Sequence, residues 1–256
     1  MHINPRIECL PDNTAKVLVE LSKKGNLNDF TLIGGTAIAL HAGHRLSEDI
    51  DLACTLTELP RKQIRKLIEA FDDAGHHVVM GTSESVRIYW ENEGGDIDDH
   101  QQDWIIDGVK VTFMAADTNE RGNFLTNKKG SLLGNIPVMS MDGLFELRSR
   151  VLTKRTFSRD GFDIWYFLDQ GGRSLDDVFA YAKQEDRFYS DDLLYRRLSP
   201  QTYPKPDPGF ETRNPNYPQN QVDLGKALQV FIDEYQQRVA ADVLNEAHET
   251  MLSPDH

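Results

Sequence analysis

The sequence predicts an α+β fold, in which a first half that combines strands and helices is followed by an all-helical second half. Up to about residue 139, short apolar runs alternate with helical patterns and with acidic or glycine-rich turns. From Ser140 onward the apolar residues recur at helical spacing. The 256 residues are enough to bury a sizeable core. We therefore expect an α/β core over 1–139, a helical block over 140–199, and a linker with a C-terminal helix over 200–256.

The first half is predicted to contain three helices and six strands. Pro60 is suited to the first turn of a helix, and Phe30-Thr31-Leu32-Ile33 has the character of a short buried strand. The expected helices span 13–24, 36–41 and 60–74. The expected strands span 30–33, 49–54, 77–80, 86–91, 103–106 and 109–114.

The second half is predicted to be helical throughout. Helices are expected over 141–154, 159–169, 174–184 and 191–198. A connection rich in proline and asparagine follows over 200–219, and a polar amphipathic helix over 222–248 completes the chain.

The composition is that of an ordinary globular protein, with 39% hydrophobic and 27% charged residues. No apolar run is long enough to span a bilayer, and the first five residues lack the basic and apolar regions of a signal peptide. The two cysteines provide neither a disulfide framework nor a thiolate zinc site. We expect a cytoplasmic protein with no membrane partner.

The formal net charge of −13 opposes a general affinity for nucleic acid. It leaves room for an RNA or nucleotide substrate held at a local basic patch. Such an anionic ligand would need metal ions or clustered arginines. The plainer interpretation is that most of these acidic residues maintain solubility.

One constellation carries chemistry: a strand, Gly34-Gly35, a short helix, and a second strand with Asp49 and Asp51. Because side chains alternate across a strand, the two carboxylates project from the same face. Carboxylates at this spacing repel each other, and a divalent cation relieves that repulsion. Magnesium fits best, since it takes one or two carboxylates and completes its shell with water and substrate phosphates.

The Gly34-Gly35 turn supplies a second half to this constellation. Without Cβ atoms the backbone can approach a ligand closely, and the helix that follows offers free N–H groups to phosphate oxygens. Thr36 adds a hydroxyl donor, and Arg45 lies close in sequence to this phosphate pocket. Metal and phosphate cradle together indicate phosphoryl transfer. The alternative is an ordinary glycine turn beside a solvated strand end.

The stretch 32–41, followed by 43–52, resembles the signature of AbiEii/AbiGii-type nucleotidyltransferase toxins, which belong to the DNA polymerase β-like superfamily. The resemblance implies a mixed sheet that bears both motifs, followed by a helical region. It also implies an NTP as donor, Mg²⁺ as cofactor, and RNA such as tRNA as acceptor. Such proteins often act as the toxin of a toxin–antitoxin or phage-defence pair, which implies a cognate antitoxin as partner.

Residues 140–168 resemble a later block of the family, in which a basic residue precedes an Arg-Asp-x-x-Asp stretch, here Arg159 to Asp163. Arg148 falls on the apolar arc of its helix and therefore needs an anionic partner. Asp160, Asp163 or substrate phosphates would serve. We expect Arg148 to neutralise developing charge, and Asp160 or Asp163 to orient it or to assist deprotonation. The alternative is that Arg148 only pairs structurally with these aspartates.

Two positions depart from the family pattern. Lysine is more usual where Arg148 stands, and a third carboxylate is common on a later strand, where this chain offers Thr112. Two alternatives to a nucleotidyltransferase that acts on RNA therefore stay open. One is a catalytically weak nucleotide- or protein-binding module. The other is a small-molecule nucleotidyltransferase of the antibiotic-modifying kind.

Overall fold

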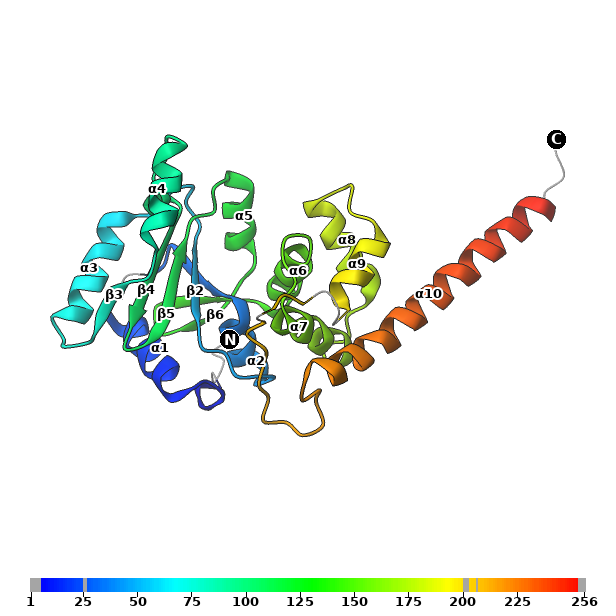
Figure 1. Cartoon of the computed structure of the whole chain (residues 1–256), viewed down its shortest axis with the longest axis horizontal. Helices are drawn as coiled ribbons and strands as arrows, with labels where there is room; N and C mark the ends of the chain where they lie inside the picture. The colour runs from blue at the N-terminus through cyan, green and yellow to red at the C-terminus, as the bar shows by residue number, and fades with distance from the viewer. Residues whose placement is uncertain (1–5, 25–26, 200–202, 206, 253–256) are drawn as a thin grey trace. The chain divides into compact units, whose positions relative to one another are not determined.

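The fold is described from a computed structural model of the chain, which covers residues 6–24, 27–199, 203–205 and 207–252 (Figure 1). The chain forms two compact units, Met1–Leu144 and Phe145–His256, and each is described by itself. In Figure 1 the first unit is coloured from blue to green and the second from green to red. Residues 1–5, and residues 200–202 and 206 of the expected connection, lie outside the described residues.

The first unit is built on a mixed sheet, which has seven strands within the described residues. The order across the sheet is β3-β4-β5-β2-β1-β7-β6. β2 pairs in parallel with β5, and β1 in parallel with β7, whereas the other neighbours are antiparallel. The strands are β1 (Phe30–Ile33), β2 (Ile50–Cys54), β3 (Val78–Met80), β4 (Gln101–Ile106), β5 (Val109–Met114), β6 (Lys129–Leu133) and β7 (Ile136–Met139).

Helices connect and flank these strands. The short 3₁₀ helix η1 (Ile7–Cys9) precedes α1, and η2 (Ile97–Asp99) precedes β4. The α-helices before and within the sheet are α1 (Asp12–Lys24), α2 (Gly34–Ala42), α3 (Arg61–Asp72), α4 (Glu84–Asn92) and α5 (Asn119–Asn127). The sequence predicted the first three of these helices, but it predicted neither α5 nor the pair β6 and β7.

The register of the central strands separates an apolar face from a polar one. Leu32 lies opposite Leu52, which lies opposite Phe113, and all three are fully buried. Phe113 also packs edge-on against Phe30, with 5.5 Å between ring centroids. Because side chains alternate along a strand, Asp51 of β2 must project from the other face. The central strand therefore buries apolar side chains on one face and presents its carboxylate on the other.

The predicted strand over 86–91 is wrong, because this segment lies in helix α4. Its aromatic and β-branched residues favour a strand by propensity. However, the Ser83 side chain accepts a hydrogen bond from the Val86 N–H and so caps a helix. Arg87 and Trp90 then lie on one side of that helix: Arg87 pairs with Asp98, and Trp90 stacks on His100 with 5.1 Å between ring centroids. These tertiary contacts at helical spacing override the strand propensity.

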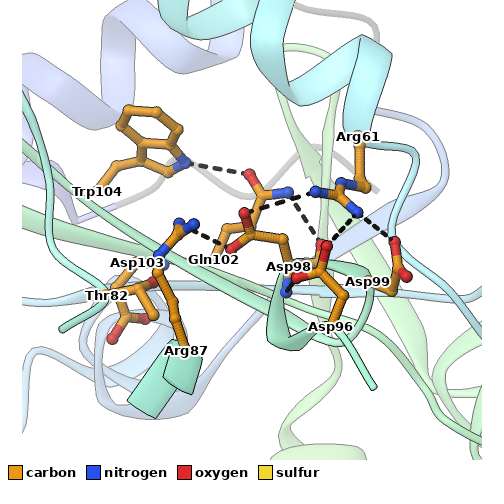
Figure 2. Close-up of polar contacts among 9 residues, drawn as sticks. All are labelled: Arg61, Thr82, Arg87, Asp96, Asp98, Asp99, Gln102, Asp103 and Trp104. Atoms are coloured by element: carbon orange, nitrogen blue, oxygen red, sulfur yellow. Dashed lines mark hydrogen bonds and ion pairs between the residues drawn. The ribbon is translucent and has the colours of Figure 1, made fainter. Parts of the chain in front are cut away.

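Two arginines anchor α3 and α4 to the acidic turn around η2 (Figure 2). Arg61 Nη1 donates to Asp96 Oδ2 at 2.8 Å and to Asp99 Oδ1 at 2.9 Å, and Arg87 Nη2 donates to Asp98 Oδ1 at 2.9 Å. The N–H of Asp98 and the Arg61 guanidinium lower the pKa of Asp96. The acidic residues around η2 therefore have a structural role, since their ion pairs hold α3 and α4 to this turn.

The second unit is helical, as predicted. It contains the last part of α6 (Met141–Val151), followed by α7 (Ser158–Asp169), α8 (Leu175–Glu185), α9 (Asp191–Leu198) and α10 (Gln221–Leu252). Its core includes Phe162 of α7, Leu194 of α9, and Leu224 and Leu228 of α10, each at most 1% exposed. No helix among the described residues is long and apolar enough to cross a membrane.

Candidate active site

The turn after β1 lies in close contact with the Asp51 side chain. Gly34 is the first residue of α2 and has a φ of +75°, a backbone conformation that residues with a Cβ rarely adopt. A Cβ at Gly34 would lie only 2.6 Å from Asp51 Oδ2. The missing side chain therefore lets the Asp51 carboxylate pack directly against the start of the helix. The predicted motifs Gly34-Gly35 and Asp51 meet in space.

A second contact holds the loop that leads to Asp49. A Cβ at Gly35 would lie 2.8 Å from Ser47 Oγ and would collide with the Arg45 guanidinium. The Thr36 hydroxyl lies 3.0 Å from Ser47 Oγ and contacts the main-chain oxygen of Asp49. Arg45, Ser47 and Thr36 are at most 7% exposed. Three predicted residues, Gly35, Thr36 and Arg45, thus form the wall that positions the segment before β2.

Ser47 was not predicted as part of this wall. It lies in the loop between α2 and β2, where no periodicity distinguishes it. Its position two residues before Asp49 was the available signal, because a short hydroxyl side chain in such a loop often forms hydrogen bonds with nearby backbone or side-chain groups.

The two carboxylates fit a magnesium ion by their donor chemistry. Asp51 lies in β2 and Asp49 directly before it, and both are partly exposed. Thr112 of β5 lies opposite Asp51 and is 4% exposed. Within the described part of the chain, no group of three His, Cys, Asp or Glu side chains has a metal-binding arrangement. If a magnesium ion binds here, Asp49 and Asp51 would supply two acidic ligands, and substrate phosphates and water would complete the octahedral shell.

The second set of predicted residues meets within the helical unit. Arg148 Nη1 lies 2.8 Å from Asp160 Oδ1, and Arg148 Nε lies 2.8 Å from Asp163 Oδ2. The Arg148 side chain is 7% exposed, and both aspartates are fully buried. Arg155 Nε contacts the second Asp160 oxygen at 3.0 Å, although the Arg155 side chain is 44% exposed. Arg148 thus bridges both aspartates, and Asp160 also binds a second arginine.

The predicted residues therefore form two clusters in different compact units. Gly34, Gly35, Thr36, Arg45, Asp49 and Asp51 belong to Met1–Leu144, and Arg148, Asp160 and Asp163 belong to Phe145–His256. The first cluster combines a glycine turn at a helix start with two partly exposed carboxylates, and the chemistry of these groups suits a phosphorylated ligand and a cation. The second is a buried ion-pair network.

Comparison with known proteins gives several matches. A curated relative, an uncharacterised protein of Aquifex aeolicus (strain VF5), is 24% identical over 184 residues, covering 72% of this chain and 79% of that protein. A crystal structure of a nucleotidyltransferase from H. pylori aligns with 89% of this chain and 98% of its own, at 12% identity and a TM-score of 0.43. The nucleotidyltransferase toxin MenT4 of Mycobacterium tuberculosis H37Rv aligns with 74% of this chain and 64% of its own, at 12% identity and a TM-score of 0.39.

The family comparison covers most of the chain. The model of the nucleotidyl transferase AbiEii toxin family, described as belonging to a type IV toxin–antitoxin system, matches residues 16–241. The match spans both units and includes both clusters of predicted residues. The chain belongs to the AbiEii family of nucleotidyltransferase toxins and is a nucleotidyltransferase.

Proposed function

We propose that the protein transfers a nucleoside monophosphate from an NTP to an RNA acceptor such as tRNA, with magnesium as cofactor. The observation that carries this proposal is the packing of Asp51 against Gly34, which joins a carboxylate to the N-terminus of a helix. Free N–H groups at a helix start bind phosphate, and paired carboxylates bind magnesium. Membership of the AbiEii family supports the same reaction class.

The chain's own residues would act mainly by positioning. The N–H groups of Gly34 and Gly35 would bind the triphosphate, and Asp49 and Asp51 would hold magnesium. The metal would neutralise charge on the phosphates. Thr36 and Arg45 would keep the turn and the Asp49 segment in place, because their side chains are nearly buried there.

The proposed step conserves atoms and electrons. The acceptor hydroxyl oxygen forms a bond to the α-phosphorus of the NTP, and the bond from that phosphorus to the bridging oxygen breaks. Pyrophosphate leaves with the bonding pair, and the hydroxyl proton passes to water. The attacking and leaving oxygens lie roughly in line in such transfers.

We propose a positioning role for the buried network in the helical unit. Arg148 is engaged by Asp160 and Asp163 and is only 7% exposed, which favours a structural bridge over direct contact with a phosphate. Full burial of both aspartates likewise argues against either as the base. The network would keep α6 and α7 in a fixed arrangement.

The family suggests a biological setting as well. We propose that the protein acts as the toxin of a toxin–antitoxin or phage-defence pair, with a cognate antitoxin encoded nearby. Its substrates, NTPs and RNA, would place it in the cytoplasm.

The test is incubation of the protein with labelled NTPs, magnesium and total RNA. Asp51→Asn removes one carboxylate charge with little change of volume, and Asp72→Asn on the exposed end of α3 is the matched control. We expect the wild type and the control to label RNA, and Asp51→Asn to lose at least about 100-fold of the rate, since charge neutralisation dominates such reactions.

Each alternative gives a different result. NTP binding by calorimetry without any label transfer would indicate a binding module. The structural observation that favours this alternative is that Thr112, opposite Asp51, is not an acid. Transfer to aminoglycosides but not to RNA would indicate a small-molecule enzyme. Equal transfer by the wild type and Asp51→Asn would refute the proposed site.

A further inference from the structure

The polar face of the sheet continues past the two carboxylates. Asp51 of β2 lies opposite Thr112 of β5, which lies opposite Asp103 of β4. Directly opposed residues in a ladder point to the same face, so all three side chains share the face of Asp51. Lys110 precedes Thr112 by two residues and therefore also projects from this face.

The register between β2 and β5 also fixes where Lys110 lies along its strand relative to the two carboxylates. Ile50 pairs with Val111, so the residues before them, Asp49 and Lys110, start at the same level of neighbouring strands. Lys110 also lies diagonally from Asp51 on the same face of these neighbouring strands. The position of Lys110 relative to Asp49 and Asp51 follows from the pairing of β2 with β5 alone, and both strands belong to the first compact unit.

Lys110 forms an ion pair through its ammonium group, and its side chain is nevertheless partly exposed to solvent. Its Nζ lies 3.0 Å from Asp103 Oδ2, and its side chain is 43% exposed, whereas that of Asp103 is 14% exposed. Asp103 is itself fixed: its other oxygen accepts from Gln101 Nε2 at 3.1 Å, and its N–H donates to Thr82 Oγ1 at 3.0 Å. Figure 2 shows Asp103 beside Thr82. Asp103, on the β4 side of Lys110, therefore holds a partly exposed cation on the sheet face that the carboxylates share.

The order of the strands decides which substrate Lys110 meets. Across the sheet, the Gly34 turn follows β1, Asp51 lies on β2, Lys110 on β5 and Asp103 on β4. If the turn binds the donor's triphosphate, pyrophosphate leaves on the β1 side of the carboxylates. In-line transfer then brings the attacking hydroxyl from the opposite side, which is the side of β5.

We propose that Lys110, positioned by Asp103, binds a backbone phosphate of the RNA acceptor strand as its terminal hydroxyl approaches the site. This inference rests on the proposed function, and it adds the side of approach and the residue that selects a polyanionic acceptor. An aminoglycoside acceptor is a polycation and would be repelled by this lysine. The competing interpretation is a cross-strand ion pair with no ligand.

The test separates RNA binding from catalysis. Binding of a 5′-labelled single-stranded RNA with a free 3′ hydroxyl is measured by fluorescence anisotropy over a series of KCl concentrations, and binding of NTP with magnesium is measured by calorimetry. Lys110→Met removes the cation, Lys110→Arg restores it, and Asp103→Asn releases it. Lys66→Met on the exposed face of α3 is the matched control.

We expect Lys110→Met to bind the RNA roughly five-fold more weakly at low salt, with the slope of log K against log [KCl] shallower by about 0.7, the value for one phosphate contact on a single strand. Lys110→Arg and the control should keep the wild-type slope, and Asp103→Asn should have an intermediate affinity. NTP affinity should stay within about two-fold of wild type in all variants, because this lysine does not face the donor.

Three results would overturn the inference. An unchanged slope in Lys110→Met would leave only a cross-strand ion pair. A loss of NTP affinity in that variant would place the lysine on the donor side, and a wild type that binds no RNA would exclude a nucleic-acid acceptor. If the RNA slope changes as expected while no label is transferred, the proposed catalysis fails and the acceptor site stands. A thermal melt of each variant identifies any that does not fold. If Lys110→Met does not fold, the RNA affinity of Lys110→Arg is compared with that of the wild type instead.

Discussion

Asp51 of β2 and Thr112 of β5 are direct partners in the parallel ladder that joins their strands. The two side chains therefore share one face of the sheet, on which Thr112 is 4% exposed. The resemblance to polymerase β-like enzymes implies a third carboxylate on the later strand. Here the ladder places a hydroxyl beside Asp51, so the proposed metal site would have one acid fewer than the resemblance implies.

This relationship predicts how Thr112→Asp responds to magnesium. A third carboxylate beside Asp51 adds repulsion in the absence of metal, so the variant should melt at a lower temperature than wild type. It should also gain more from added Mg²⁺, because metal that binds only the folded state stabilises it by about 1.4 kcal/mol at ten times its Kd. The measurement is the Tm over a magnesium titration.

Thr112→Asn is the control for this experiment, since it matches the shape of aspartate without the charge. Its Tm should depend on magnesium no more than that of the wild type. If Thr112→Asp and Thr112→Asn respond equally to Mg²⁺, the metal does not bind at Asp51.

The Gly34 turn predicts a second, independent result. Gly34→Ala forces a Cβ into a left-handed residue at 2.6 Å from Asp51 Oδ2, so it should displace the carboxylate and reduce transfer at least about tenfold. The backbone strain alone costs about 1–2 kcal/mol. Unfolding in urea and the rate of transfer together measure both effects.

Gly75 provides the matched control for that strain. It has a φ of +85°, and a Cβ there would meet no atom within 4 Å. Gly75→Ala should therefore cost a similar backbone strain and leave transfer by the folded protein unchanged. Equal losses of activity in the two variants would mean that Asp51 does not depend on the glycine.

The sequence predicted the fold best where periodicity was strong. The four buried residues of β1 and the helical spacing of the second half were sufficient to locate those elements. β6 and β7 were missed because Gly130 interrupts one strand and Pro137 the other, and both residues weaken a strand pattern. The helix α4 was mistaken for a strand because its capping serine and its contacts with Asp98 and His100 outweigh local propensity.

Contacts within the candidate site were predictable where its residues are close in sequence. Gly34 and Asp51 were identified from motif spacing, and their contact follows from the antiparallel pairing of Ile33 with Asp51. Lys110 and Asp103 were missed as a pair, because which strands become neighbours is a tertiary property. The alternation of β5 alone already placed Lys110 and Thr112 on one face, and this signal was available.

The turn between β4 and β5 predicts a pH effect on stability. The Asp107 carboxylate accepts from the His77 N–H at 2.9 Å and contacts His76 Nδ1 at 2.7 Å, and these hydrogen bonds, that with His76 foremost, lower its pKa. A group with a lowered folded pKa stabilises the protein above its unfolded pKa of about 3.9, and this stabilisation disappears as the pH falls through the folded value.

Asp107→Asn isolates this contribution. Asparagine tolerates the φ of +48° at this position and keeps an acceptor for the His77 N–H, but it carries no charge. Urea unfolding should find the wild type more stable at pH 7 by less than about 1 kcal/mol, since the carboxylate is 42% exposed and screened by solvent. The difference should shrink as the pH falls from 5 towards 3, in the range set by the two pKa values of Asp107. A difference that is independent of pH would show that the charge contributes nothing.

The buried network predicts a stability defect from the loss of one arginine. Arg148→Met removes the arginine that bridges Asp160 and Asp163, both of which are fully buried, so unfolding in urea should show a loss of about 3–5 kcal/mol. Arg155→Met is the matched control: its side chain is 44% exposed, and the expected loss is below about 1 kcal/mol.

A double variant separates a structural role from a catalytic one. Arg148→Met combined with Asp163→Leu also removes one of the two buried carboxylates that Arg148 contacts, and it should recover part of the lost stability. If Arg148 acts by positioning, transfer per folded molecule should recover with it. A variant Arg148→Met of wild-type stability that transfers no nucleotide would instead place the arginine on the substrate. Because both aspartates are fully buried, the structure favours the first outcome.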